Sequence, residues 1–239
     1  MGVSAAAAAG GCNLFSAGTV VSTSRSLRLE NGFFFGHDLR QDDSLVYVLD
    51  LSGSMNERTG SALEQVEKST AAEAGGSLIS SVAGRGVGSA AKDNVLNMDQ
   101  KVELVKDHLI ASLRGLPSGA KFNVILFSGG VQKLAPGMIE ANTASTTLVS
   151  AFVSRLKAGG ATSLQSALAA GLDTDAKDLL LLTDGLPTDA TPDAILHMVH
   201  ERNTEGARHV STVGVGADQA KDFLTRLATE NGGRYTSYS

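Results

Sequence analysis

Blocks of apolar and polar residues alternate along the chain with spacings that separate strands from helices. Four segments are nearly continuous runs of aliphatic or β-branched residues: LVYVLD from Leu45, KFNVILF from Lys121, DLLLLTD from Asp178 and HVSTVGVG from His209. Runs of this length are typical of strands buried on both faces of a sheet. A shorter segment, VQKLAP, follows the second run across a Gly-Gly pair and predicts an antiparallel hairpin at the sheet edge.

The segments between these runs repeat apolar residues every three or four positions, as helices with one buried face do. Five segments show this pattern: residues 99–116, 145–160, 163–172, 191–203 and 217–233. In the second of them, the expected buried face carries Val149, Phe152, Val153 and Leu156. Strands that alternate with helices at this spacing form right-handed βαβ units. The pattern therefore predicts a doubly wound α/β fold, with a mostly parallel sheet between helices on both faces.

Two regions lie outside this pattern. Residues 1–43 are expected to form a leader and an approach segment, in which the three phenylalanines at 33–35 pack on the edge of a domain that spans 44–239. Residues 56–98 form an insertion rich in Ala, Gly and Ser after the first strand. Long insertions of this kind either have a function or are surface excursions without one, and both interpretations stay open.

Composition narrows the class of protein. The 239 residues are 42% hydrophobic, 19% charged and 5% aromatic with no Trp, which indicates a globular domain with an aliphatic core. A net charge of -5 argues against a nucleic-acid partner. No apolar run approaches a transmembrane span, and a small-residue stretch before the single Cys12 is only weakly similar to a lipoprotein signal. A cytoplasmic and a cell-envelope location both remain open.

Polar side chains stand where the predicted strands end. Asp50, Ser52 and Ser54 directly follow the first strand, Asp184 ends a later one, and Thr162 precedes a helix. Ligands of open parallel sheets bind beyond the carboxyl ends of the strands, so these five side chains are expected to converge on one crevice. The sequence thus predicts a single polar site at that edge.

The predicted site offers only oxygen atoms. Two carboxylates and three hydroxyls suit Mg²⁺ or Mn²⁺, whereas zinc and copper favour His and Cys, and Ca²⁺ fits less well. Two negative charges leave the ion electrophilic, with one coordination position for a carboxylate from outside. Asp50→Ala is expected to abolish metal binding without loss of the fold, because the carboxylate is expected at the rim of the core.

The segment DLSGS is a D-x-S-x-S motif, and together with Thr162 in GGATS and Asp184 in TDG it resembles the von Willebrand factor type A domain with its metal-ion-dependent adhesion site. The resemblance is to bacterial-type members. It implies a six-stranded sheet ordered 3-2-1-4-5-6 with one antiparallel edge strand. It also implies that the five site residues hold the metal and that an Asp or Glu of a partner protein completes its coordination. Glu57 and Gly185, beside the site, are expected to contact the partner.

Several functions share this site. The first hypothesis is a metal-dependent protein-binding or adhesion module, and the second is a regulatory subunit of an ATPase complex of the MoxR or chelatase kind. A third is a structural component of a larger assembly. A metal-dependent hydrolase needs a general base near the ion, and the sequence shows no candidate for that base, so we do not expect an enzyme.

Overall fold

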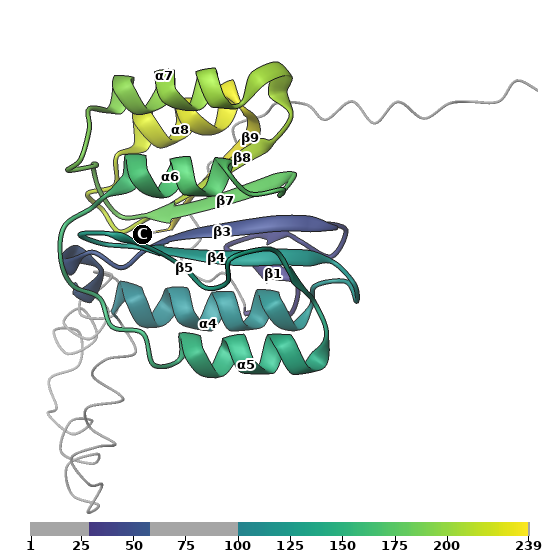
Figure 1. Cartoon of the computed structure of the whole chain (residues 1–239). Helices are drawn as coiled ribbons and strands as arrows, with labels where there is room; N and C mark the ends of the chain where they lie inside the picture. Colours follow the sequence, from purple (N-terminus) through teal and green to yellow (C-terminus); the bar gives the residue numbers. More distant parts are fainter. Residues whose placement is uncertain (1–28, 58–99, 239) are drawn as a thin grey trace, which may run out of the picture.

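A computed structural model describes residues 29–57 and 100–238, which form one central sheet and the helices that cover it (Figure 1). Nearly all of the predicted insertion lies outside the described residues, as does the stretch that contains Cys12. Within the described ranges, no helix is long and apolar enough to cross a membrane.

The strand order of the main sheet is β5-β4-β3-β7-β8-β9, with the short strand β6 beside β4. The strands are β3 (Ser44–Asp50), β4 (Lys121–Phe127), β5 (Val131–Lys133), β6 (Ile139–Glu140), β7 (Asp178–Thr183), β8 (His209–Val215) and β9 (Gly232–Tyr238). Neighbours from β4 through β9 are parallel, whereas β5 and β6 pair with β4 in the antiparallel sense. Apart from the added β6, this confirms the predicted order 3-2-1-4-5-6 and the antiparallel hairpin at the edge.

Five α-helices follow the predicted segments. They are α4 (Lys101–Arg114), α5 (Thr143–Val153), α6 (Leu164–Leu172), α7 (Pro192–Arg202) and α8 (Lys221–Glu230), with 3-10 turns η1 (Gly53–Asn56) and η2 (Thr204–Gly206). Helices α4 and α5 cover one face of the sheet, and α6, α7 and α8 cover the other (Figure 1). The start of α7 has a local cause, because the Thr191 hydroxyl accepts a hydrogen bond from the Ala194 N–H at 3.3 Å and Pro192 occupies the first turn.

The apolar strands bury both of their faces. In β3, Leu45, Tyr47 and Leu49 join the core cluster on the α4 side. Val46 and Val48 join the cluster beneath α6, α7 and α8. Successive side chains of a strand point to opposite faces, so two cores require an apolar residue at every position. This explains why the sequence shows continuous runs instead of alternation.

A small hairpin before β3 adds to the core. It consists of β1 (Phe33–Phe34) and β2 (His37–Asp38), joined by Phe35 and Gly36 at φ 47° and 80°. Both residues of a type I′ turn need positive φ, which explains the glycine and makes the phenylalanine unusual. Phe34 and Phe35 are fully buried in the cluster on the α4 side. The approach segment therefore packs into the core, and more deeply than an edge contact would.

Helix α5 departs from the predicted buried face. Val149 and Val153 are buried, but Phe152 is 36% exposed, and the helix ends before Leu156. The helix forms a second layer on α4 (Figure 1), so only a narrow stripe of its surface faces other apolar residues. The predicted stripe was therefore too wide at Phe152.

Candidate metal centre

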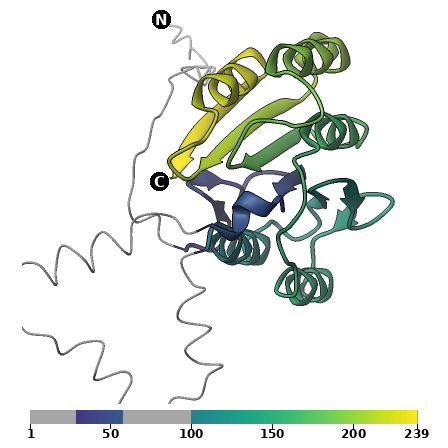
Figure 2. The same cartoon turned by 90° about the vertical axis from the view of Figure 1, so that its left-hand side faces the viewer.

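The two predicted acids lie at the carboxyl ends of neighbouring strands. Asp50 is the last residue of β3, and Asp184 follows the last residue of β7. The two strands are parallel, with Leu49 opposite Leu182, so both chains leave the sheet at the same level. Figure 2 looks onto this edge, where η1 crosses near the middle of the molecule. The expectation that the two acid-bearing strands are neighbours is confirmed.

Hydrogen bonds join the two serines to the second acid. The hydroxyl oxygens of Ser52 and Ser54 are 3.1 Å apart, and the Ser54 hydroxyl donates to Oδ1 of Asp184 at 2.8 Å. Ser52 and Asp184 are buried, and Ser54 is partly exposed. Oxygens that are adjacent ligands of a six-coordinate ion at 2.0–2.1 Å stand about 3 Å apart. The Ser52–Ser54 pair and the Ser54–Asp184 pair therefore each have the spacing of adjacent metal ligands.

Asp50 stabilises the turn that contains Ser52 and Ser54 through hydrogen bonds. Its side chain is fully buried, its Oδ1 accepts from the Ser52 N–H at 2.7 Å, and its Oδ2 accepts from the Thr183 hydroxyl at 2.5 Å. Burial raises the pKa of Asp50 from 3.8 to about 6, and the hydrogen bonds from Thr183 and Ser52 oppose part of that rise. The expectation of a carboxylate at the rim was wrong, because Asp50 is enclosed and both of its oxygens have donors.

Thr162 is held beside this turn by its neighbours' backbone. Gly53 in η1 donates its N–H to the Gly160 carbonyl at 3.0 Å. On the other side, the Thr188 N–H donates to the Thr162 carbonyl at 2.9 Å, and the Thr162 N–H donates to the Thr188 hydroxyl at 3.0 Å. Thr162 thus lies between η1 and the loop that follows Asp184. Among the described residues, no hydrogen bond joins its hydroxyl to the other four predicted ligands.

A lysine that the sequence analysis did not select completes the cluster. Lys101, the first residue of α4, is buried and places Nζ 2.8 Å from Oδ2 of Asp184 and 3.3 Å from Oε2 of Glu57. Burial opposes its protonation, but the hydrogen bonds and charges of Asp184 and Glu57 raise the pKa of Lys101 above its ordinary value. The cluster therefore holds an ammonium ion next to one of its two acids.

The two residues predicted to meet a partner lie next to this cluster. The side chain of Glu57 is 66% exposed, and its carboxylate pairs with Lys101. Gly185 is partly exposed and donates its N–H to the Thr183 hydroxyl at 3.3 Å. Their contact with a partner stays a prediction.

The donors fit a hard divalent ion. Within the described ranges, no three or more His, Cys, Asp or Glu side chains gather into a group that could hold a metal ion. The cluster instead presents the Ser52 and Ser54 hydroxyls and Oδ1 of Asp184, above a buried carboxylate. Lys101 occupies Oδ2 of Asp184 and leaves Oδ1 on the side of the serines. An ion with oxygen ligands fits this set with one added positive charge as its neighbour.

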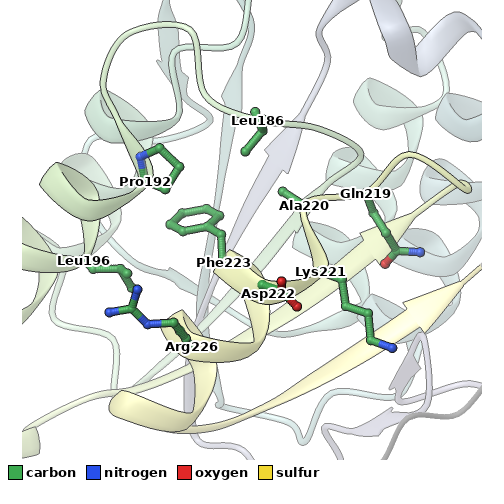
Figure 3. Close-up of a pocket in the computed structure, with 9 residues that line it drawn as sticks. All are labelled: Leu186, Pro192, Leu196, Gln219, Ala220, Lys221, Asp222, Phe223 and Arg226. Atoms are coloured by element: carbon green, nitrogen blue, oxygen red, sulfur yellow. The ribbon is translucent and has the colours of Figure 1, made fainter.

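A cavity of about 480 Å³ adjoins the loop after Asp184 (Figure 3). Its lining includes Leu186 from that loop, Pro192 at the start of α7, and Phe223 from α8, whose ring faces the cavity. Leu186 is 59% exposed. Two residues span at most about 7 Å of chain, so the cavity begins close to Asp184.

Known proteins share both the sequence and the fold. The family model for the von Willebrand factor type A domain matches residues 92–237, more than half of the chain. Inter-alpha-trypsin inhibitor heavy chain H1 of Mesocricetus auratus is 29% identical over 148 residues, which are 56% of this chain and 16% of that protein. The von Willebrand factor A domain-containing protein 3B of Homo sapiens is 28% identical over 149 residues, 62% of this chain and 11% of that protein. The chain thus spans a small part of these relatives.

Solved structures agree on the fold. The von Willebrand factor type A protein from Catenulispora acidiphila superimposes with a TM-score of 0.58 at 20% identity, over 82% of this chain and 38% of that chain. The conserved hypothetical protein BatB from Bacteroides thetaiotaomicron gives a TM-score of 0.53 at 14% identity, over 81% of this chain and 88% of that chain. These structures and the observed strand order agree on the fold, and the family match over more than half of the chain shows that it belongs to the von Willebrand factor type A domain family.

Proposed function

We propose that this domain is a metal-dependent protein-interaction module that binds an Asp or Glu side chain of a partner protein. Mg²⁺ or Mn²⁺ would be held by Ser52, Ser54 and Thr162, with Asp50 and Asp184 as the acids of the site. When bound, the ion supplies a coordination position for the partner's carboxylate. The observation that carries the proposal is the chain of oxygens from Ser52 through Ser54 to Asp184, at 3.1 and 2.8 Å.

The residues around the ion would act by orienting these oxygens. Asp50 accepts a hydrogen bond from the Ser52 N–H, so it would stabilise the turn that contains both serines. Thr183 holds the other oxygen of Asp50 and ties that turn to the end of β7. A site whose ligands are held in place before binding loses less conformational freedom when an ion enters. Two carboxylates and one ammonium leave a site that an outside anion can complete.

Specificity would come from the surface beside the ion, because a single carboxylate bond is common to many partners. Leu186 and the adjoining cavity provide an apolar contact near Asp184. Gly185, beside Leu186 on the loop after Asp184, and Glu57, after η1, also flank the site, where they would meet residues next to the partner's acidic side chain. A ligand that joins an acidic residue to an apolar one fits this surface best.

The first test measures metal binding. Asp50→Asn keeps the size and one acceptor oxygen of the buried side chain, so it removes the charge with less damage than alanine would cause. We expect Mn²⁺ binding to weaken by at least ~10-fold in this variant, measured by electron paramagnetic resonance of free Mn²⁺. Asp173→Asn is the matched control, since Asp173 caps α6 and its side chain is 63% exposed. Equal affinity in Asp50→Asn and the wild type would refute the proposed site.

The second test identifies the partner. The full chain is used to retain proteins from an extract of its native host, with Mg²⁺ or with chelator, next to Asp50→Asn. Proteins retained only by the wild type with metal support the module, and an ATPase among them would favour a regulatory subunit. Retention of the same proteins under all conditions would show that recognition does not use the metal.

A further inference from the structure

Lys101 occupies a position that a lysine would ordinarily avoid. It is the first residue of α4, where the partial positive charge of the helix amino terminus disfavours a cation. Its side chain is only 7% exposed, so it has also given up most of its contact with water. Two unfavourable conditions of this kind require a compensating partner, and Asp184 at 2.8 Å provides it.

The fold leaves room for this side chain. Gly216, just after β8, has φ 93°, and a Cβ atom at that position would lie 2.8 Å from Cε and 3.1 Å from Nζ of Lys101. A side chain at residue 216 would therefore displace the Lys101 side chain from its position beside Asp184. The ammonium group thus lies next to Gly216 after β8 and is bound by Asp184 after β7.

Lys101 makes the net charge of the site less negative than the charge of the two carboxylates alone. Asp50 and Asp184 supply two negative charges, and Lys101 returns one positive charge in direct contact with Asp184. A divalent ion entering this cluster meets repulsion from the buried Lys101 ammonium, whose Nζ lies 2.8 Å from Oδ2 of Asp184. After it enters, the site has an excess positive charge, which a carboxylate from a ligand would cancel.

We propose that Lys101 is a built-in cation that keeps the affinity of the site for Mg²⁺ or Mn²⁺ low until an acidic ligand binds, so that ion and ligand bind cooperatively. This inference rests on the proposed function of the site. The coupling must be mutual, because a carboxylate that tightens metal binding is itself bound more tightly in the presence of the metal. The domain would then hold little metal without a partner.

A purely structural role for Lys101 makes a different prediction. The Lys101 N–H also donates to the Glu57 carbonyl at 3.0 Å, so the lysine joins the start of α4 to Glu57, the last described residue before 58–99. If that connection were its only role, loss of the side chain would loosen the site and weaken metal binding. Glu57→Gln tests the connection alone, because it removes the charge of the outer partner and leaves the ammonium beside Asp184.

The experiment measures Mn²⁺ affinity by electron paramagnetic resonance for the full-length wild type, Lys101→Met, Lys101→Gln, Glu57→Gln and Asp50→Asn. Each protein is titrated alone and with a large excess of acetate as the carboxylate ligand, and a thermal melt shows that each is folded. We expect Lys101→Met and Lys101→Gln to bind Mn²⁺ ~10- to 100-fold more tightly than the wild type. Glu57→Gln should not tighten binding. Acetate should increase the affinity of the wild type by a larger factor than that of Lys101→Met.

The outcomes separate this inference from the proposed function. If the wild type binds Mn²⁺, Asp50→Asn does not, and both Lys101 variants bind equally or more weakly, the role of Lys101 is refuted and the metal site stands. If neither the wild type nor the Lys101 variants bind more Mn²⁺ than Asp50→Asn, both proposals fail. Equal tightening by Glu57→Gln would also overturn the inference, because the effect would then not require removal of the lysine.

Discussion

His108 should make the stability of the fold depend on pH between neutral and mildly acidic conditions. The ring lies in α4, is 2% exposed and stacks on Phe35 with ring centroids 4.0 Å apart. Its Nε2 is buried without a hydrogen-bond partner. Burial lowers the pKa of His108 from 6.5 to about 4. Between these two values the unfolded chain takes up a proton that the folded chain does not, so the free energy of unfolding falls as the pH falls.

The size of this effect follows from the two pKa values. From pH 7 to pH 5 the lost stability amounts to about 2 kcal/mol, at 1.36 kcal/mol for each pKa unit. Other groups titrate in the same range: burial lowers the pKa of His37 to about 3, which acts in the same direction, and raises the pKa of Asp50 to about 6, so that protonation of Asp50 on acidification favours the folded state. The wild-type pH profile alone therefore does not isolate His108.

His108→Phe isolates it, because the variant keeps an aromatic ring on Phe35 and removes the titrating nitrogens. Urea unfolding at pH 7 and pH 5 gives the difference in free energy between the variant and the wild type at each pH. We expect the variant to gain ~2 kcal/mol of stability relative to the wild type between pH 7 and pH 5. Any steric cost of the larger ring is the same at both pH values and cancels in this comparison. His200→Gln, which changes an exposed histidine of α7, is the control. An identical difference at both pH values would refute the reasoning.

Two further substitutions test the supports of the site. Thr183→Val removes the hydroxyl that donates to Oδ2 of buried Asp50 and keeps the side-chain volume nearly constant. We expect it to lower the free energy of unfolding by ~1–3 kcal/mol, measured by urea unfolding without added metal. An unchanged urea midpoint would show that this hydrogen bond makes no net contribution to stability. Gly216→Ala places a side chain at φ 93° and against Lys101, and should cost ~1–2 kcal/mol or more in the same assay, whereas Gly130→Ala, at a loop position with open space around it, is the control.

Much of the fold could be predicted because its causes are local or repetitive. The strands β3, β4, β7 and β8 bury both faces, so their sequences are continuous apolar runs that need no knowledge of their neighbours. By contrast, β9 starts with two glycines and carries polar side chains, and no run marks it. Its burial depends on β8 and α8, which are not visible from its own residues.

The candidate site shows the same division. Asp50, Ser52 and Ser54 stand within five residues, and Asp184 ends an obvious strand, so topology alone places them together. Lys101 was missed, although it lies four positions before buried Val105 on the apolar side of α4. A lysine on the buried face at a helix amino terminus is itself a signal, because both circumstances are unfavourable without an acidic partner.

The turn of the N-terminal hairpin shows where sequence rules do not apply. Type I′ turns favour Asn or Gly, and Phe35 at φ 47° follows neither preference. Its ring is buried against His108 and Tyr238, with centroids 4.0 and 5.5 Å away. Tertiary packing thus overrides the local preference. The sequence FFFG could therefore predict a contact at the domain edge, but it could not predict this turn.

The contact between Glu57 and Lys101 also determines how the domain can be altered. Glu57 and Lys101, which lie on either side of residues 58–99 in the sequence, are joined by a backbone hydrogen bond of 3.0 Å and an ion pair of 3.3 Å. With both attachment points fixed, doubling the length of chain between them costs only about 0.6 kcal/mol in closure entropy. A foreign peptide or a small folded domain could therefore replace this segment while the sheet remains intact. Any such graft would be attached next to Lys101 and hence beside Asp184 of the candidate site, which makes the position a suitable place to engineer new binding specificity.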